Sequence, residues 1–301
     1  MKNICVSHKY CYDGLASAWV FEEYFKLDRG RTTSDDVIFT TRNNEWEETH
    51  LLELIENKFD IEAIYFIDYC PTENALDALN SNNIDFKIID HHADAKANLI
   101  KWGYEDKLTY DSEHSGCVLA WRYFFGNTRP IMPLVFSYIE KQDLWKMTRQ
   151  EDQFIAEYLQ FKLHKYETSE ISHLLLIFDL SEARTIGSTL WFKKKNEIDF
   201  VTRKAALVDF DGKEILAVNS NTNRSEIGHV LSEKSPTGLG LVYSITAYNS
   251  VHVSVRGKGA NSFCKDFGGG GHEEASGFSM ELKKFMSYLE SAKPYNGGVK
   301  K

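Results

Sequence analysis

The sequence FKIIDHH, residues 86–92, joins a short, mostly apolar segment to one aspartate and two histidines. Short apolar segments bounded by polar residues are typical of buried strands. A second segment has the same form, because AIYFI at residues 63–67 is followed directly by Asp68. Both segments therefore predict strands that end in chemically active side chains.

The surrounding sequence alternates between strand and helix patterns. Such alternation predicts an α/β fold, in which a parallel sheet carries helices on its faces. From residue 112 to about residue 196 the pattern becomes almost wholly helical. We predict further strands at 2–7 and 37–40, and helices at 15–26, 46–57, 73–79, 116–125, 134–145, 152–163, 171–178 and 183–195.

The last hundred residues return to strand patterns and predict a smaller α/β domain with a mixed sheet. Because 301 residues suit two domains of about 150 residues, we divide the chain into an N-terminal domain 1–180, a helical linker 181–202 and a C-terminal domain 203–301. Residues 296–301 are predicted to be a loose tail. The predicted C-terminal elements are strands at 205–208, 215–218, 239–247, 251–255 and 275–278, helices at 225–231 and 260–267, and a four-glycine loop at 268–271.

The charge of the chain is negative and unevenly distributed. The formal net charge is −9, which argues against coating of long nucleic acid, including long duplex DNA, because that role needs excess Lys and Arg. Residues 201–301 carry 13 Lys and Arg against 10 Asp and Glu, whereas residues 1–200 carry 22 against 34. Scattered acid keeps a protein soluble, and clustered acid is typical of cation sites.

The cysteines and the hydropathy predict a cytoplasmic protein. Five widely spaced cysteines include no CxxC pair, which fits a reducing compartment. The first residues, MKNICVSH, lack the apolar core of a signal peptide. No segment approaches 18 consecutive apolar residues, so we predict no membrane span and no membrane partner.

Four motifs place polar side chains at the ends of predicted elements: residues 7–18 (SHKYCYDGLASA), 67–69 (IDY), 89–92 (IDHH) and 140–145 (EKQDLW). Open α/β sheets bind ligands at the carboxyl ends of their strands. Taken singly, a histidine there is usually a hydrogen-bonded loop residue, and an aspartate is usually a helix cap. Together, imidazoles and carboxylates suit Mn²⁺, Fe²⁺, Co²⁺ or Zn²⁺. The candidate metal ligands are His8, Asp13, Asp68, His91 and Asp143.

With a fifth motif, GGGGHEEASGF at residues 268–278, the sequence resembles the DHH-family phosphoesterases that carry a DHH-associated C-terminal domain. This family comprises metal-dependent hydrolases: single-strand exonucleases, nanoRNase-type oligoribonucleases, cyclic-dinucleotide phosphodiesterases and family II pyrophosphatases. The glycine-rich motif separates the first three kinds from the pyrophosphatases. The resemblance implies that residues 1–180 form the metal-binding catalytic domain and that residues 203–301 bind substrate.

The resemblance also implies a role for each residue of the motifs. It implies two divalent ions, for which we expect Mn²⁺, with the ion at His8 more weakly held. Asp13, His91 and Asp143 would bind one ion, His8 would bind the other, Asp68 would bridge them, His92 would meet the substrate phosphate, and Asp90 would orient a histidine. The catalytic residues are thus expected to be His92, Asp68 and Asp90.

Two positions leave alternatives open. Many members of the family have a carboxylate where this chain has Cys11. Cys11 is then a thiolate ligand that favours a softer metal, or a spectator that leaves the His8 ion weakly bound, or a sign that the enzyme works with one tight ion. Ser115 is a candidate for the start of a helix whose N-terminus faces the site.

The C-terminal motif predicts the substrate side of the site. Glycines leave backbone N–H groups unobstructed, so Gly268, Gly269, Gly270 and Gly271 are predicted to form an anion-binding nest, with His272 beside it. Arg256 can hold a phosphate through two hydrogen bonds. We therefore expect a monomer or homodimer that hydrolyses short single-stranded oligonucleotides or linear dinucleotides to nucleoside monophosphates by metal-activated water.

Other functions remain open from the sequence alone. Cleavage of cyclic dinucleotides or oligonucleotides would use the same catalytic motifs, and hydrolysis of polyphosphate or of 3′-phosphoadenosine 5′-phosphate is also compatible with them. A metal-poor nucleotide sensor without catalysis is the alternative outside the enzymes. The tryptophans Trp19, Trp121 and Trp145 lie at helical spacing among apolar residues, which predicts that they belong to the core.

Overall fold

A computed structural model describes residues 2–8, 10–29, 37–40, 49, 53, 61–126, 128–129, 131–246 and 248–295. The chain forms two compact units, Met1–Trp191 and Phe192–Lys301. Their boundary falls in helix α9 (Leu180–Thr202), and the finer division at residues 180 and 202 stays a prediction. The helix predicted at 46–57 lies outside the described residues, apart from Thr49 and Glu53, as does the tail predicted at 296–301.

The first unit is built on a five-stranded sheet in the order β2-β1-β3-β4-β5. Every pair in it is parallel, which confirms the predicted parallel sheet. Ser7 pairs with Ile67, and Ile67 pairs with Ile89, so the last residues of β1, β3 and β4 lie level at one edge. The strands are β1 (Lys2–His8), β2 (Val37–Thr40), β3 (Ile61–Ile67), β4 (Asp85–Asp90) and β5 (Leu108–Tyr110).

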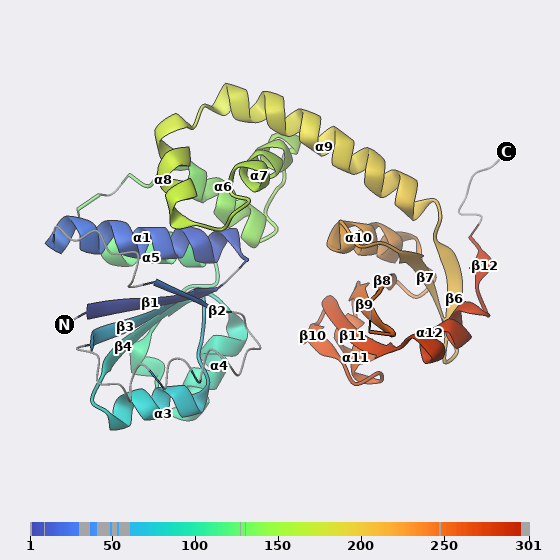
Figure 1. Ribbon diagram of the computed structural model, residues 1–301, viewed down its shortest axis with the longest axis horizontal. Coiled ribbons are helices and arrows are strands. Elements are labelled where there is room, and N and C mark those ends of the chain that lie inside the picture. Colours follow the sequence, from blue (N-terminus) through green and yellow to red (C-terminus); the bar gives the residue numbers. More distant parts are fainter. Residues whose placement is uncertain are drawn as a thin grey trace. The chain divides into compact units, whose positions relative to one another are not determined.

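Helices cover both faces of this sheet (Figure 1). Alternate strand residues point to opposite faces. Cys5, Ile67 and Ile89 pack with α1 (Tyr12–Arg29) and α5 (Gly116–Phe125). Their neighbours Val6, Phe66 and Ile88 pack instead with α3 (Glu73–Ser81) and α4 (Ala93–Trp102). The predicted fold class is therefore confirmed.

A helical segment extends the core above α1 and α5. Its helices are α6 (Leu134–Asp143), α7 (Gln150–Lys162) and α8 (Thr168–Ile177), followed by α9. Trp19 and Trp121 are buried, as predicted. The prediction for Trp145 is wrong, because its side chain is 72% exposed. Helix α6 ends at Asp143 instead of residue 145, so helical spacing no longer places Trp145 toward the core.

The second unit contains a seven-stranded mixed sheet in the order β10-β11-β9-β8-β7-β6-β12. Only the β7–β8 pair is parallel. Helix α10 (Arg224–Lys234) packs on one face, and α11 (Ala260–Lys265) and α12 (Leu282–Leu289) pack on the other. The strands are β6 (Ala206–Phe210), β7 (Lys213–Asn219), β8 (Gly240–Ile245), β9 (Ser250–Arg256), β10 (Gly270–His272), β11 (Ala275–Glu281) and β12 (Lys293–Pro294).

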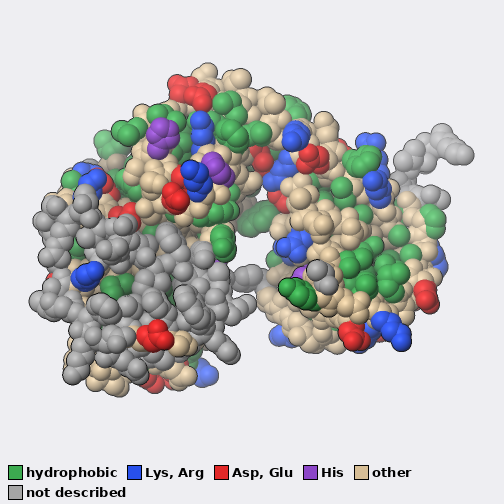
Figure 2. All heavy atoms as spheres, viewed as in Figure 1, with side chains coloured by type: hydrophobic (Ala, Val, Ile, Leu, Met, Phe, Trp, Pro, Cys, Tyr) green, Lys and Arg blue, Asp and Glu red, His purple; other side chains and the backbone are tan. Residues whose placement is uncertain are grey.

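On the face drawn in Figure 2, the described residues carry both signs of charge. The coloured Lys and Arg side chains there are scattered among Asp and Glu side chains and form no continuous basic area. Among the described residues, no helix combines the length and the apolar character that crossing a membrane requires.

Candidate functional site

Three neighbouring parallel strands end in polar residues at one edge of the first sheet. Because Ser7, Ile67 and Ile89 are paired across the sheet, the residues that follow them, His8, Asp68 and Asp90, emerge side by side. Asp68 leaves the strand direction at once, since its φ of 57° is in the left-handed region. Its N–H donates to the Ile89 carbonyl at 3.0 Å, which fixes this turn against β4.

The start of α1 brings Asp13 to the same edge. The buried Ser7 Oγ lies 2.7 Å from the Gly14 carbonyl and 3.0 Å from the Ile67 carbonyl, which ties α1 to two strands. A Cβ at Gly14 would lie 2.3 Å from the His8 carbonyl oxygen. Only glycine therefore permits this close approach, which places the buried Asp13 beside the strand ends.

The N-terminus of α5 holds the Asp13 carboxylate. The Gly116 N–H donates to Oδ2 at 2.6 Å, and the Cys117 N–H donates to Oδ1 at 2.9 Å. Free N–H groups and the helix dipole favour a negative charge at this position. Ser115 is the N-cap of α5, so the helix begins where the sequence predicted, and its N-terminus contacts the site.

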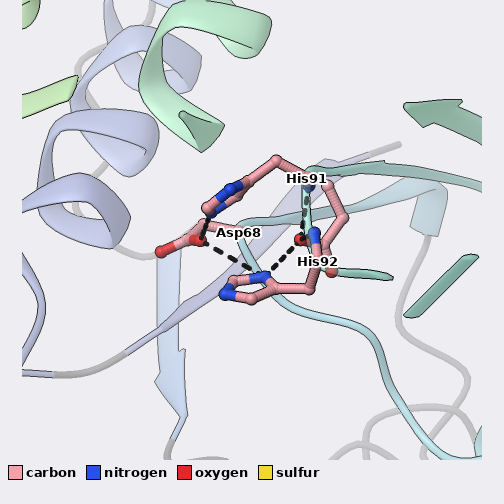
Figure 3. Close-up of side chains that lie close together, drawn as sticks. Asp68, His91 and His92 are labelled. Carbon is pink, nitrogen blue, oxygen red and sulfur yellow. Dashed lines mark hydrogen bonds and ion pairs between the residues drawn. The ribbon is translucent and has the colours of Figure 1, made fainter. Parts of the chain in front are cut away.

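His91 lies among three carboxylates. Its Nε2 is 3.3 Å from Asp68 Oδ1, 3.4 Å from Asp143 Oδ2 and 3.9 Å from Asp13 Oδ2. Figure 3 shows the side chains of His91 and His92 turned toward Asp68 from the end of β4. The structure therefore brings together four of the five predicted metal ligands around one imidazole nitrogen.

Two atoms of this cluster are buried without a hydrogen-bond partner among the described residues: His91 Nε2 and Asp143 Oδ2. Burial, with the charges of Asp13 and Asp68, raises the pKa of Asp143 to about 7. Buried polar atoms are normally paired, and carboxylates this close repel one another. A divalent cation bound here would pair these buried atoms and offset the repulsion between the carboxylates. The residues therefore fit a metal ion.

Besides the cluster of Asp68, Asp90, His91 and His92, two smaller groups of potential ligand atoms lie in the first unit. Asp13, His91 and Asp143 are one group, and His8, Cys11 and Asp68 are another, with the ligand atoms of each group within 4.8 Å of one another. Asp68 belongs to the second group and also lies 3.3 Å from His91. This arrangement is compatible with a bridging Asp68.

Cys11 lies within reach of an ion at the second group. Burial and the negative charges of Asp68, Asp13 and Asp143 raise the pKa of its thiol well above the ordinary value. The thiol is therefore neutral unless a cation offsets these charges. The geometry fits the explanation of Cys11 as a ligand, and the spectator and single-ion explanations stay open beside it.

Asp90 positions His92. Its Oδ1 lies 2.6 Å from His92 Nδ1 and also accepts the backbone N–H groups of His91 at 2.7 Å and His92 at 3.1 Å. Burial alone would raise the pKa of Asp90, but these bonds and the two imidazoles hold the pKa below its ordinary value. An ionised Asp90 fixes the ring orientation through Nδ1.

Ser115 has a partner that the sequence did not reveal. Glu140 Oε2 accepts the Ser115 N–H at 3.1 Å and lies 3.1 Å from His114 Nδ1. This carboxylate therefore joins the end of α6, which carries Asp143, to the start of α5, which holds Asp13. Glu140 is the first residue of the motif EKQDLW, but nothing in its spacing indicates which N–H group it accepts.

The predicted substrate residues lie in the second unit. The Arg256 guanidinium donates to Ser225 Oγ at 2.8 Å and to the Val255 carbonyl at 3.0 Å. The prediction of a four-glycine loop is wrong in part, because Gly270, Gly271 and His272 form β10 and pair with β11. Pairing requires the glycine there, since a Cβ at Gly271 would lie 2.7 Å from the Ala275 carbonyl oxygen.

Two of the backbone N–H groups expected to bind an anion already donate hydrogen bonds within the chain. The N–H groups of Gly268 and Gly269 donate to the carbonyls of Lys265 at 3.0 Å and Cys264 at 2.9 Å. These two groups are therefore engaged within the chain. A role for the glycines and His272 in substrate binding stays a prediction.

Known proteins share this fold. No family model matches the chain. An uncharacterized protein of Acanthamoeba polyphaga mimivirus is 25% identical over 295 residues, which are 92% of this chain and 67% of the viral protein. A pGpG-specific phosphodiesterase from Vibrio cholerae aligns with a TM-score of 0.52 at 11% identity, over 96% of this chain and 97% of its own.

A second solved structure carries the name that the motifs predicted. It is the DHH domain of a protein described as a member of the s1p family of ribosomal proteins. It aligns with a TM-score of 0.57 at 15% identity, over 96% of this chain and 85% of its own. The chain therefore has the fold of the DHH-family phosphoesterases.

Proposed function

We propose that the protein is a metal-dependent phosphodiesterase that hydrolyses short single-stranded oligonucleotides or linear dinucleotides to nucleoside monophosphates. The observation that carries this proposal is the buried cluster of His91 with Asp13, Asp68 and Asp143 at the carboxyl edge of the sheet. A purely structural cluster would pair its buried atoms, whereas His91 Nε2 and Asp143 Oδ2 have no hydrogen-bond partner among the described residues.

In this proposal each residue has a defined task. Asp13, His91 and Asp143 would hold one ion, His8 would hold a second, and Asp68 would contribute to both. Divalent metal ions, for which we propose Mn²⁺, would lower the pKa of a bound water molecule and offset the charge of the phosphate. Asp90 lies 2.6 Å from Nδ1 of His92 and orients the ring, and His92 would contact a phosphate oxygen of the substrate.

The comparisons support the substrate class at a coarse level. One protein of the same fold is a pGpG-specific phosphodiesterase, and pGpG is itself a linear dinucleotide. We further propose that the second unit, through Arg256, binds a part of the substrate that is distant from the scissile bond. The formal net charge of −9 favours short substrates over long duplexes, because binding of long nucleic acid depends on excess Lys and Arg.

The first prediction concerns Asp68. Purified protein with Mn²⁺ should convert 5′-labelled oligonucleotides of two to five residues into nucleoside monophosphates, measured by product chromatography. Asp68→Asn should lower kcat by at least about 1,000-fold, because it removes the negative charge of the carboxylate that is proposed to contribute to both metal sites. The exposed carboxylate of Asp106 provides a matched control, since Asp106→Asn makes the same chemical change away from the cluster.

The same assay separates the alternatives. Cyclic dinucleotides and polyphosphate belong in the panel, because their hydrolysis would use the same cluster. Equal turnover by the Asp68→Asn variant would eliminate the bridging role. A wild-type protein that retains no Mn²⁺ and releases no monophosphate from any substrate would favour the nucleotide sensor.

A further inference from the structure

Three aromatic residues adopt a backbone conformation that such residues rarely adopt. Among the described residues, eight positions other than glycine have positive φ, and five of these are Asn or Asp, which tolerate the left-handed region. The remaining three are Tyr10, Trp145 and Tyr166, with φ of 59°, 55° and 57°. All three lie in the first unit. Strained positions of this kind cluster at functional sites.

Two of the three are explained by contacts with each other. Tyr10 packs edge-on against Tyr166, with ring centroids 5.6 Å apart. Tyr166 also stacks on Tyr12 at 5.4 Å, and its hydroxyl lies 3.4 Å from the Tyr12 hydroxyl. These three rings therefore stabilise one another within the fold.

Trp145 has no such explanation. Trp145 is 72% exposed, and its side chain makes no ring contact or hydrogen bond with any described residue. Tryptophan has the largest apolar surface of any side chain and normally buries most of it. An exposed, strained indole two residues after Asp143 therefore needs another reason.

The turn that carries Trp145 is held firmly. The N–H groups of Leu144 and Lys146 donate to the carbonyls of Glu140 and Lys141 at 2.9 and 2.8 Å. Lys146 Nζ also lies 3.1 Å from the Glu113 carboxylate, in the loop that leads to α5. The indole is therefore presented from a fixed backbone, so binding a ligand there requires little further ordering of the chain.

We propose that Trp145 is the platform on which a nucleobase of the substrate stacks. This inference rests on the proposed function and narrows it to substrates that carry bases, which excludes polyphosphate. A substrate of two to five nucleotides offers few phosphates for ionic contacts, so stacking supplies affinity that charge does not. Stacking on an aromatic ring accepts any base, because every base has a π-face.

Two probes isolate the base. AMP and ribose 5-phosphate both carry the sugar and phosphate, and only AMP carries a base. Their binding to the Mn²⁺-loaded protein is measured by calorimetry. Trp145→Ala should weaken AMP binding on the order of 5- to 100-fold and leave ribose 5-phosphate within about twofold, while Trp145→Phe should lie between. Phe161, also an exposed aromatic residue of the first unit at 54%, provides the control Phe161→Ala, which should change neither.

A purely structural role is tested with glycine. Gly adopts positive φ without strain, so Trp145→Gly should fold with a midpoint of thermal unfolding no lower than that of Trp145→Ala, and should lose AMP affinity equally. Equal effects of Trp145→Ala on both probes, or none on AMP, would overturn the stacking role. A protein that binds AMP through Trp145 and hydrolyses no phosphodiester would instead overturn the proposed function alone.

Discussion

Asp143 shows most clearly what the cluster requires. Burial and two neighbouring carboxylates raise its pKa from 3.8 to about 7 in the metal-free fold. Between these two values the unfolded chain has released the Asp143 proton while the folded protein keeps it. The free energy of unfolding therefore decreases as the pH rises from about 4 to about 7, and the lost stability is not recovered above pH 7.

Replacing Asp143 should consequently stabilise the metal-free protein. At pH 8 with a chelator, Asp143→Asn should raise the free energy of unfolding by on the order of 1–3 kcal/mol, and at pH 4 the two proteins should agree. Added Mn²⁺ should stabilise the wild type and have much less effect on the variant, because ligands stabilise only the state that binds them. Urea unfolding measures both effects, and a variant less stable than wild type at pH 8 would contradict the assignment.

At this scale the sequence predicted which residues converge, and missed how they are held. The motifs predicted that His8, Asp13, Asp68, His91 and Asp143 lie close together, and their binding of metal ions stays a prediction. The motifs did not reveal Glu140, because hydrogen bonds to backbone N–H groups leave no spacing signal. The error at Trp145 has a different cause: a left-handed backbone, which costs a non-glycine residue about 1–2 kcal/mol, ended the helix where the apolar pattern continued.

Helices and strands were predicted best where packing is simple. The central strands of the first sheet, β1, β3 and β4, and helix α5, Gly116–Phe125, follow the apolar pattern because most of their residues are buried, whereas the short strands β5 and β12 were not predicted. Helix α4 was not predicted, since it buries only Ala95 and Leu99 and starts directly after His92. Strand β10 was read as a loop because glycine has low strand propensity, and only its pairing with β11 reveals it.

The contact between α5 and the cluster leads to a prediction for Gly116. A Cβ there would lie 2.6 Å from Asp68 Cβ and 3.0 Å from Asp13 Oδ2. Gly116→Ala should therefore displace both carboxylates, lower the affinity for Mn²⁺ at least about 10-fold and reduce the free energy of unfolding by about 1–3 kcal/mol.

Metal titration and urea unfolding test this together. Val118 lies on the same helix and is buried in the core, so Val118→Ala should reduce stability and leave Mn²⁺ affinity unchanged. If Gly116→Ala also lowered stability and left Mn²⁺ affinity unchanged, α5 would contribute to the stability of the fold and would not position the metal ligands.

For the whole molecule, the distribution of charge says more than its sum. The net charge of −9 argues against coating of long nucleic acid, but the acidic cluster lies in the first unit, where cations would offset it. Residues 201–301 carry a small excess of Lys and Arg, 13 against 10. This asymmetry supports a division of labour in which the first unit performs the chemistry and the second holds the substrate.

Arg256 tests that division. Its guanidinium has five N–H donors and spends one on Ser225 and one on Val255, so three can still meet a phosphate. Arg256→Ala should raise KM for a linear dinucleotide about 10- to 100-fold, the value of a charged hydrogen bond, with kcat nearly unchanged. Lys284, an exposed cation on α12, provides the control Lys284→Ala, which should alter neither constant. Asp68→Asn should show the opposite signature, a loss of kcat. If Arg256→Ala instead lowered kcat at constant KM, the second unit would contribute to the chemical step, and the proposed separation of the two tasks would be wrong.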